Sequence, residues 1–317
     1  MLQFRLIPHD QPKLTDVPPS PRSFQSCVPC VHGLILALSI LLMIGPAQVL
    51  AADGPPLKSL AVLVVDQDTG ESLISKNADV VMPIASLTKL MTALVVLETH
   101  PPMDEVLEIG NDDVDREKHT RSRLVVGTRL SRADMLLLAL MASENRAAMS
   151  LSRAYPGGRE AFIDRMNAKA RSLGMTSTHF ADPAGLSSET TSTARDLLRL
   201  VNAADAQAVI RNDSTQEEGT VLVRRHAMTF VNTNRMVRNS RDWDIELQKT
   251  GFTNEAGRCL VMRATTLNHT LSMVFLNSFG KLTRFADAKR VREHLEQFEN
   301  RQPRRATNVA TATKGTS

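Results

Sequence analysis

The stretch "MPIASLTKLMTALVVLE", residues 82–98, combines a proline and small residues with an apolar run that has helical periodicity. Ser86 and Lys89 stand three residues apart where that helix should begin. Because positions i and i+3 share one face of a helix, the amine can reach the hydroxyl. A serine hydroxyl is a weak nucleophile until a base takes its proton. The stretch therefore predicts a serine nucleophile activated by a lysine.

The start of a helix also contributes an electrostatic field. Its positive end and free N–H groups should lower the pKa of Lys89 and stabilise a developing oxyanion. The same four-letter pattern, S-x-x-K, recurs at Ser278–Lys281 near the end of a predicted strand. We assign no function to that copy, so the S-x-x-K pattern alone does not identify a site.

A second element is Ser143-Glu144-Asn145, which separates two apolar helical stretches at 131–143 and 144–155. Serine and asparagine favour helix caps and turns because their side chains bond local backbone groups. A hydroxyl and an amide between helices can also relay a proton and bind a peptide carbonyl. Both interpretations fit this element when it is taken by itself.

A third element is Lys249-Thr250-Gly251, at the end of a strand-like run. A lysine and a threonine on a strand that borders a cleft can bind a substrate carboxylate. A glycine beside them lets another backbone approach closely. An edge-strand lysine that deters aggregation would explain Lys249 alone, but not the trio.

The wider pattern predicts an α+β fold. Residues 59–77 read as two strands around a turn at 68–70, and 157–174 and 192–204 read as helices. Strands are expected at 220–230, where "RRH" (224–226) would be a solvated face, and at 245–253, 259–267 and 269–278, before a closing helix at 284–299. Strands at both ends with helices between them favour one sheet shared by the two ends.

The N-terminal region has the layout of a secretory signal, with an apolar stretch at 34–45 and small residues up to Ala51 and Ala52. We therefore expect a signal peptide at 1–52, with an uncleaved anchor as the alternative. A single catalytic domain should follow at 53–299, and then a disordered basic tail at 300–317. These features predict export to the periplasm without a stable membrane anchor.

Composition narrows the function further. The 317 residues are 42% hydrophobic and 23% charged, with a net charge of +4. The positive charge forms no dense Lys/Arg stripe, so we expect no nucleic-acid partner. Cys27 and Cys30 lie in the expected signal, which leaves Cys259 as a buried small hydrophobe. The eight histidines show no metal-ligand spacing, so neither a metal nor another cofactor is expected.

The order S-x-x-K, S-x-N, K-T-G resembles the signature of penicillin-binding proteins and serine β-lactamases. The stretches "HFADPAGL" (179–186) and "NTNRM" (232–236) sharpen the resemblance. Over about 57–299 the chain resembles the low-molecular-mass D-alanyl-D-alanine peptidases of peptidase family S11. The Ser-Glu-Asn form and the short C-terminus are similar to the endopeptidase branch of that family, the penicillin-binding protein 7 type.

The resemblance implies an antiparallel sheet flanked by helices, with an α-helical lobe and a cleft between them. It implies an acyl-enzyme that cleaves peptidoglycan stem peptides and cross-links and that binds β-lactam antibiotics. The roles implied are Ser86 as nucleophile, Lys89 as general base, Ser143 and Asn145 in proton relay and substrate orientation, and Lys249, Thr250, Gly251 and Phe252 in substrate binding. The backbone N–H groups of Ser86 and Phe252 would form the oxyanion hole.

Three alternatives stay open at this stage. A D-alanyl-D-alanine carboxypeptidase would use the same residues. A β-lactamase would need fast deacylation, which a glutamate in an E-x-x-L-N stretch would serve. No such stretch lies between Ser143 and Lys249, and the residues around Glu160 match it only loosely. A non-enzymatic β-lactam-binding protein should lack a motif residue or carry signalling helices, and neither is visible in the sequence.

Overall fold

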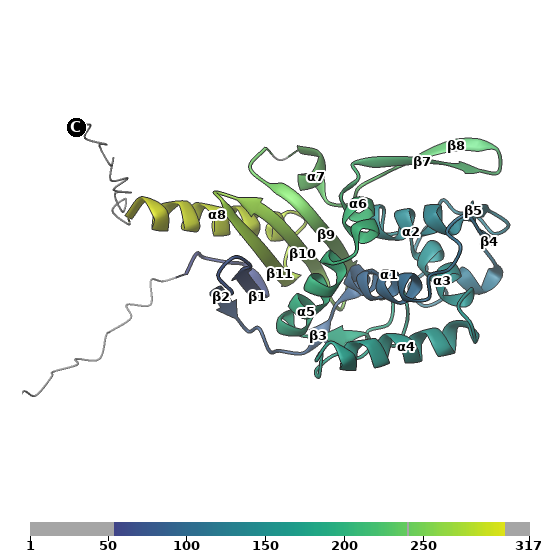
Figure 1. The fold of residues 1–317 in the computed structure, drawn as a ribbon, viewed down its shortest axis with the longest axis horizontal. Coiled ribbons are helices and arrows are strands. Elements are labelled where there is room, and N and C mark those ends of the chain that lie inside the picture. The colour runs from purple at the N-terminus through teal and green to yellow at the C-terminus, as the bar shows by residue number, and fades with distance from the viewer. Residues whose placement is uncertain (1–53, 240, 302–317) are drawn as a thin grey trace, which may run out of the picture. The chain divides into compact units, whose positions relative to one another are not determined.

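The computed structural model describes residues 54–239 and 241–301. Its largest sheet is antiparallel, with strand order β2-β1-β11-β10-β9 (Figure 1). The strands are β1 (Ser59–Asp66), β2 (Ser72–Lys76), β9 (Asp244–Thr253), β10 (Gly257–Thr266) and β11 (His269–Ser278). Because β1 pairs with β11, the two ends of the domain share one sheet, as predicted.

Each face of this sheet is covered by helix. On one face, α8 (Thr283–Arg301) buries Ala288, Val291 and Leu295 in a cluster with side chains of β1, β10 and β11. On the other face, α5 (Ala194–Asp205) packs against β1 and β11 and continues into the helical part of the domain. That part also contains α1 (Lys89–Glu98), α2 (Arg132–Met141), α3 (Asn145–Arg153), α4 (Gly158–Ser172) and α6 (Ala208–Thr215).

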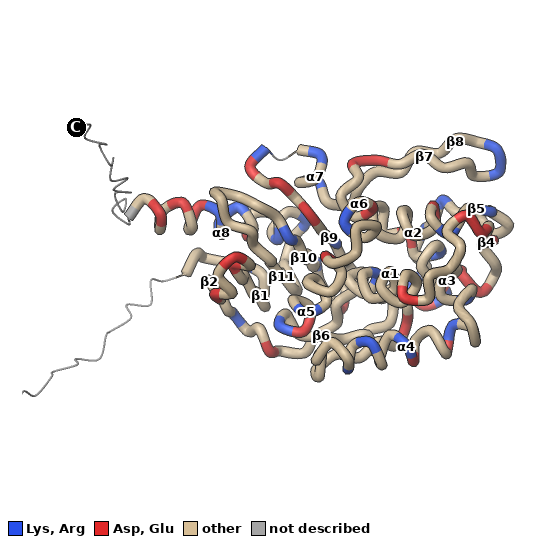
Figure 2. Tube along the Cα trace, in the orientation of Figure 1, with Lys and Arg blue, Asp and Glu red and all other residues tan. Residues whose placement is uncertain are grey.

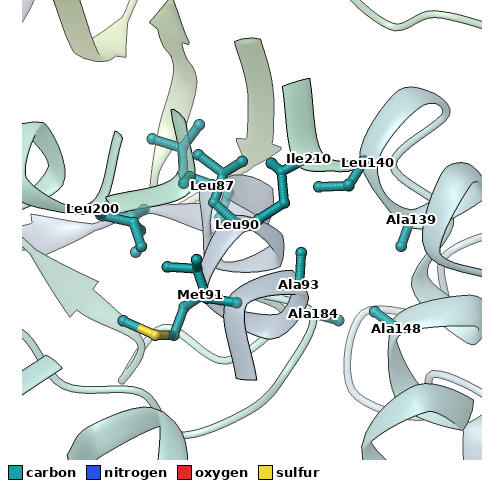
Figure 3. Close-up of a cluster of buried hydrophobic side chains, with 14 of the residues drawn as sticks. Leu87, Leu90, Met91, Ala93, Ala139, Leu140, Ala148, Ala184, Leu200 and Ile210 are labelled. Carbon is teal, nitrogen blue, oxygen red and sulfur yellow. The ribbon is translucent and has the colours of Figure 1, made fainter. Parts of the chain in front are cut away.

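Helix α1 forms the centre of the helical part. Eight of its ten residues are buried, since its sequence is apolar on almost every side. Figure 3 shows Leu90 and Met91 among side chains contributed by α2, α3, α5 and α6. Packing on all sides gives α1 little freedom to move, and Lys89 is its first residue.

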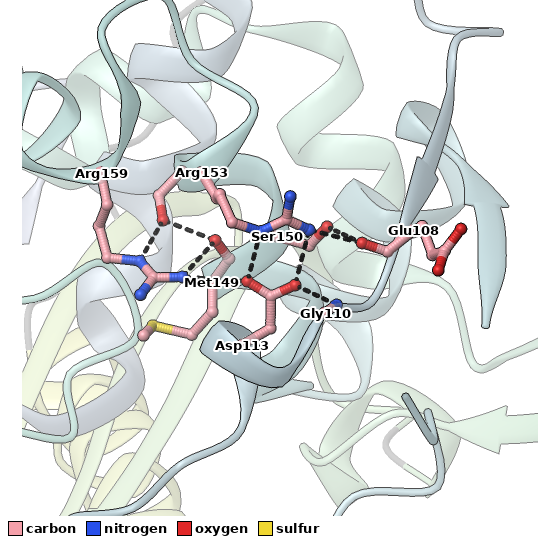
Figure 4. A network of polar contacts seen from close by, with 8 residues as sticks. Glu108, Gly110, Asp113, Met149, Ser150, Arg153 and Arg159 are labelled. Atoms are coloured by element: carbon pink, nitrogen blue, oxygen red, sulfur yellow. Dashed lines mark hydrogen bonds and ion pairs between the residues drawn. The ribbon is translucent and has the colours of Figure 1, made fainter. Parts of the chain in front are cut away.

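A buried carboxylate anchors the segment after β4 (Val106–Glu108), which pairs with β5 (Arg129–Ser131). Asp113, in the short 3₁₀ helix η2 (Asn111–Asp113), accepts hydrogen bonds from Arg153, Arg159 and the Gly110 backbone N–H (Figure 4). Since the Asp113 side chain is fully buried, these partners stabilise a charge that burial alone would disfavour.

One predicted strand is instead a hairpin. Residues 220–230 belong to β7 (Glu218–Val223) and β8 (His226–Val231). The interpretation of 224–226 as a solvated strand face was wrong for Arg224 and Arg225, whereas His226 is an exposed residue of β8. Arg224 and Arg225 make the two-residue turn with φ of +48° and +69°. Such turns usually carry glycine or asparagine, so the sequence held no turn signal. The Arg224 guanidinium donates to the Val126 carbonyl at 2.8 Å, which holds the turn in place.

Most other predicted elements are confirmed. The strands around 68–70 and the helices near 131–143, 144–155, 157–174 and 192–204 are present, and Cys259 is fully buried. The closing helix continues to Arg301, beyond its predicted end. The sequence missed α6, α7 (Arg235–Asn239) and the short strand pair β3 (Met82–Pro83) and β6 (Thr191–Ser192).

The predicted signal peptide at 1–52 and nearly all of the predicted tail lie outside the described residues. Within residues 54–239 and 241–301, none of the helices is long and apolar enough to cross a membrane.

Candidate active site

Ser86 lies in a 3₁₀ turn, η1 (Ala85–Thr88), immediately before α1. The predicted helix thus begins at Lys89, with a tighter turn in front of it. Side chains at i and i+3 eclipse one another in a 3₁₀ helix, which brings the Lys89 amine over the serine. The Lys89 Nζ donates to Ser86 Oγ at 2.8 Å.

Two carbonyl oxygens orient the Lys89 amine. Its Nζ also donates to Asn145 Oδ1 at 2.7 Å and to the Ala184 backbone carbonyl at 2.7 Å. Both oxygens can only accept hydrogen bonds. When Lys89 is neutral, they therefore hold its two remaining hydrogens and direct its lone pair at the Ser86 hydroxyl.

Burial sets the protonation of Lys89. Removal from water lowers the pKa of this fully buried amine to about 7, while the negative charges of Asp182, Glu144 and Asp115 oppose that shift. The sequence had assigned the lowered pKa to the field at the helix start. The structure gives desolvation as the larger cause, because the amine lies beneath packed side chains.

Asp182 shapes the loop that presents the Ala184 carbonyl. Its carboxylate accepts hydrogen bonds from the backbone N–H groups of residues 184–187, at 2.6 to 3.0 Å, and from the Thr190 hydroxyl at 2.9 Å. Gly185 adopts a positive φ of +74°, and a Cβ placed on it would lie 1.9 Å from the Ala85 carbonyl oxygen. The loop thus packs directly against the turn that carries Ser86.

A chain of hydrogen bonds supports Asn145 from behind. Its Nδ2 donates to Thr120 Oγ1 at 2.9 Å, and the Thr120 hydroxyl donates to Asp115 Oδ2 at 2.7 Å. Asp115 also accepts three backbone N–H groups of its own loop. These bonds fix the Asn145 amide with its oxygen toward Lys89.

Ser143 occupies the junction of α2 and α3. It has a left-handed backbone, with φ of +58°, and is half-buried. Its hydroxyl has no hydrogen-bond partner among residues 54–239 and 241–301, in contrast to Asn145. Ser143 therefore precedes Asn145 by two residues without a hydrogen bond in the described part of the chain that would fix its hydroxyl, and its role in proton relay stays a prediction.

Strand β9 forms the opposite side of the site. A Cβ on Gly251 would lie 3.0 Å from the Ile84 carbonyl oxygen and 3.2 Å from the Ser86 nitrogen. The glycine of the third motif is thus required for a close backbone approach, as predicted. Next to it, the Thr250 hydroxyl donates to Thr233 Oγ1 at 2.7 Å.

Lys249 is fully buried, and its Nζ donates to the Thr250 backbone carbonyl at 2.9 Å. Burial, followed by the charges of Lys89 and Arg284, holds the pKa of Lys249 well below its usual range. Among the described residues, the structure thus places Lys249 beside no carboxylate, and its predicted role in binding a substrate carboxylate stays a prediction.

Phe252 lies at the rim, where β9 leaves the site. Its ring is half exposed, and the Arg258 guanidinium of the neighbouring strand stacks 4.2 Å from the ring centre. The predicted site residues therefore form a continuous arrangement from η1 through the α2–α3 junction to the end of β9.

Sequence reasoning missed several residues that support the site. Asp182 stood in a quoted stretch, where Asp-Pro-Ala-Gly is typical turn chemistry, but the pattern does not tell which backbone groups the carboxylate holds. Asp115, Thr120 and Arg284 carry no local signal. They act through contacts with residues far away in the sequence.

Comparison with known proteins agrees with this geometry. The profile of peptidase S11, described as D-alanyl-D-alanine carboxypeptidase, matches residues 48–280. A D-alanyl-D-alanine endopeptidase of Pseudomonas aeruginosa is 48% identical over 84% of this chain and 89% of its own length. A protein of the same name from Escherichia coli is 46% identical over 79% and 81%. The crystal structure of the Streptomyces K15 DD-transpeptidase has a TM-score of 0.70 at 27% identity and covers 76% of this chain and 98% of its own.

Proposed function

This chain belongs to the peptidase S11 family, and we propose that it is a serine D-alanyl-D-alanine endopeptidase that hydrolyses peptide cross-links of peptidoglycan. The Lys89 amine, held 2.8 Å from Ser86 Oγ by two carbonyl acceptors, is the observation that carries this proposal. It supplies a base for the serine without a histidine. The names of the Pseudomonas aeruginosa and Escherichia coli relatives support the choice of endopeptidase.

Acylation follows from this geometry. Neutral Lys89 accepts the proton of the Ser86 hydroxyl as the oxygen attacks the D-alanyl carbonyl carbon. The C–N bond then breaks, and the leaving amine takes a proton while Ser86 keeps the acyl group. Since the pKa of Lys89 is about 7, the base can both accept and return a proton near neutral pH.

Charge stabilisation and positioning come from the opposite side of the site. The backbone N–H groups of Ser86 and Phe252 are assigned to the oxyanion hole, and the close approach of Gly251 to the Ser86 nitrogen supports that pairing. Lys249 and Thr250 are assigned to a carboxylate of the substrate or of a β-lactam. Water then attacks the acyl-enzyme, with Lys89 again acting as the base.

The proposal includes the compartment. A signal-like N-terminus and family membership support action in the periplasm, on stem peptides and their cross-links. β-Lactam antibiotics are expected to acylate Ser86, because they present a strained amide to the same nucleophile.

Covalent labelling tests the nucleophile. Wild-type protein should become labelled by a fluorescent penicillin, and Ser86→Ala should lose the label while retaining its circular dichroism spectrum and thermal midpoint. Ser278→Ala is the matched control, since it alters the serine of the second S-x-x-K pattern. Undiminished labelling of Ser86→Ala would remove Ser86 from the mechanism.

A paired assay tests the bond that is cut. Equal enzyme concentrations are given a cross-linked muropeptide dimer or a monomeric pentapeptide, and the products are identified by mass. The proposal predicts faster cleavage of the dimer. Release of D-alanine from the monomer with an intact dimer would identify a carboxypeptidase instead.

A further inference from the structure

A groove that the mechanism above does not use opens beside Ser143. Its volume is about 390 Å³, and its lining comes from three segments: 121–123, Ala142 with Glu144, and Phe230 with Val231. Ala142 and Glu144 are the chain neighbours of Ser143, so the groove lies next to that residue of the second motif. At its other side, Val231 ends β8 just before Thr233, the hydrogen-bond partner of Thr250.

Arg123 is pre-arranged along this groove. Its guanidinium stacks 3.7 Å from the centre of the buried Phe230 ring, and Nη1 donates to the Thr229 carbonyl at 2.8 Å. No other hydrogen bond or ion pair of this guanidinium occurs within the described part of the chain, so its remaining N–H groups are available. A fixed planar guanidinium is well suited to a carboxylate, because little side-chain freedom is lost on binding.

Arg121 adds a second positive charge to the same groove. Its side chain is exposed and has no hydrogen bond or ion pair among residues 54–239 and 241–301. The arginines of the β7–β8 turn, Arg224 and Arg225, lie at the other end of the hairpin from Val231 and do not line the groove (Figure 2). The two exposed guanidinium groups of the groove itself favour an anion.

The acidic residue that lines the groove is withdrawn from its surface. Glu144 is buried, and it accepts a hydrogen bond from the Ser122 hydroxyl. Burial raises the pKa of Glu144. Arg121 and Arg123 are exposed instead, so a ligand in the groove meets their guanidinium groups first.

We propose that this groove binds a free carboxylate of the peptidoglycan stem peptide, on the part of the substrate that stays bound to Ser86 after cleavage. The inference rests on the proposed function, which places the stem peptide in this cleft. Lys249 and Thr250, on β9, are assigned to the carboxylate of the leaving side, which leaves the Ser143 side for the acyl donor. Two sources share the required chemistry: the α-carboxylate of the γ-linked glutamyl residue and the free carboxylate of the diamino acid.

The test measures binding without cleavage, so that it does not depend on the endopeptidase assignment. Three synthetic stem tetrapeptides are titrated into Ser86→Ala protein: one unmodified, one amidated at the glutamyl carboxylate and one amidated at the diamino-acid carboxylate. The proposal predicts that one amidation weakens binding about tenfold, as expected for loss of one charge-assisted pair. The weakened peptide identifies the source.

Arginine variants complete the cycle in the same Ser86→Ala background. Arg123→Ala should weaken binding of the unmodified peptide about tenfold and leave binding of the sensitive amidated peptide unchanged. Arg121→Ala, which removes an exposed side chain, should act in the same direction without a cost in folding. Arg225→Ala at the hairpin turn is the matched control and should change neither affinity.

Equal loss for charged and amidated peptides, or an effect of Arg225→Ala as large as that of Arg123→Ala, would overturn the proposal. If all three peptides bind equally well to every variant, the groove has no carboxylate specificity and the proposal also fails. Cleavage of the dimer by the wild-type enzyme is scored separately, so failure of the endopeptidase assignment remains distinguishable.

Discussion

Lys89 and Lys249 are both fully buried, but their hydrogen-bond acceptors and neighbouring charges differ between the two sides of the cleft. Lys89 has three hydrogen-bond acceptors and three acidic residues within reach of its charge. Lys249 bonds one carbonyl and faces two cations, Lys89 and Arg284. One side therefore holds a lysine that can exchange a proton, and the other holds a lysine that lacks an anion. The difference agrees with the proposed division of roles, in which Lys89 is a base and Lys249 binds a negative charge.

The strongest test of this comparison replaces each lysine by arginine. Lys89→Arg should lower the second-order rate of penicillin acylation by about 10²- to 10⁴-fold, since arginine does not give up its proton and general-base catalysis is lost. Lys249→Arg keeps a cation available for a carboxylate and should lose much less. The rates are measured by stopped-flow with a reporter β-lactam, and equal losses would contradict the division of roles.

The second test uses pH. Because the proposed base is neutral Lys89 and its pKa is about 7, acylation should rise with pH and level off above that value. Below it, the rate should fall about tenfold for each pH unit, as the protonated fraction takes over. A flat profile between pH 5 and pH 8 would show that another group is the base.

The third test alters the acidic surroundings of Lys89. Asp182→Asn removes the largest of the charges that raise the pKa of Lys89, so the rising limb of the pH profile should move to lower pH. Asp115→Asn is the matched control, since Asp115 contributes a smaller share, and it should produce a smaller shift. A shift to higher pH in either variant would contradict the assigned electrostatics.

The fourth test addresses Lys249. A bound carboxylate favours the charged form of a lysine, so binding should raise the lowered pKa of Lys249 and should be accompanied by proton uptake. Calorimetry of Ser86→Ala protein in buffers of different ionisation enthalpy measures this uptake. Lys249→Met should reduce the uptake to the share of Lys89, whose pKa is about 7. Proton release on binding, or an uptake that is unchanged in Lys249→Met, would show that Lys249 does not gain a proton when the ligand binds.

The smallest effect is expected for a surface ion pair that connects the two sides of the cleft. Lys118 lies on the loop that carries Thr120, and it contacts Glu255 after β9 at 2.6 Å. Both side chains are partly exposed, so Lys118→Ala should leave the thermal midpoint unchanged and alter acylation by less than about threefold. A larger loss that is reproduced by 0.5 M salt in the wild type would mean that the pair keeps the cleft closed.

The comparison also shows where sequence reasoning succeeds. Ser86, Lys89 and Gly251 could be predicted because spacing along one turn, or a backbone approach that only glycine permits, is encoded locally. The shared sheet followed from strand patterns at both ends. The turn at Arg224 and Arg225 was not predicted, since tertiary contacts rather than turn residues maintain its positive φ angles.

The electrostatic character of the site could not be predicted in the same way. The pKa of Lys89 depends on how completely packing excludes water and on acids 26 to 93 residues away in the chain. The state of Lys249 depends on Arg284, which belongs to the closing helix. The pKa values of both lysines are set by contacts between segments that are distant in the sequence, so no local sequence pattern predicts them.

If Ser86 is the nucleophile proposed above, the two glycines that pack against its turn would restrict how the enzyme can evolve resistance to β-lactams. Gly185 lies against the Ala85 carbonyl on one side, and Gly251 lies against the Ile84 carbonyl on the other. A side chain at position 185 would displace the turn that carries Ser86, and the proposed attack on drug and natural substrate would suffer alike. Under that mechanism, escape mutations that preserve growth are expected at the rim, where an antibiotic and a stem peptide would occupy different space.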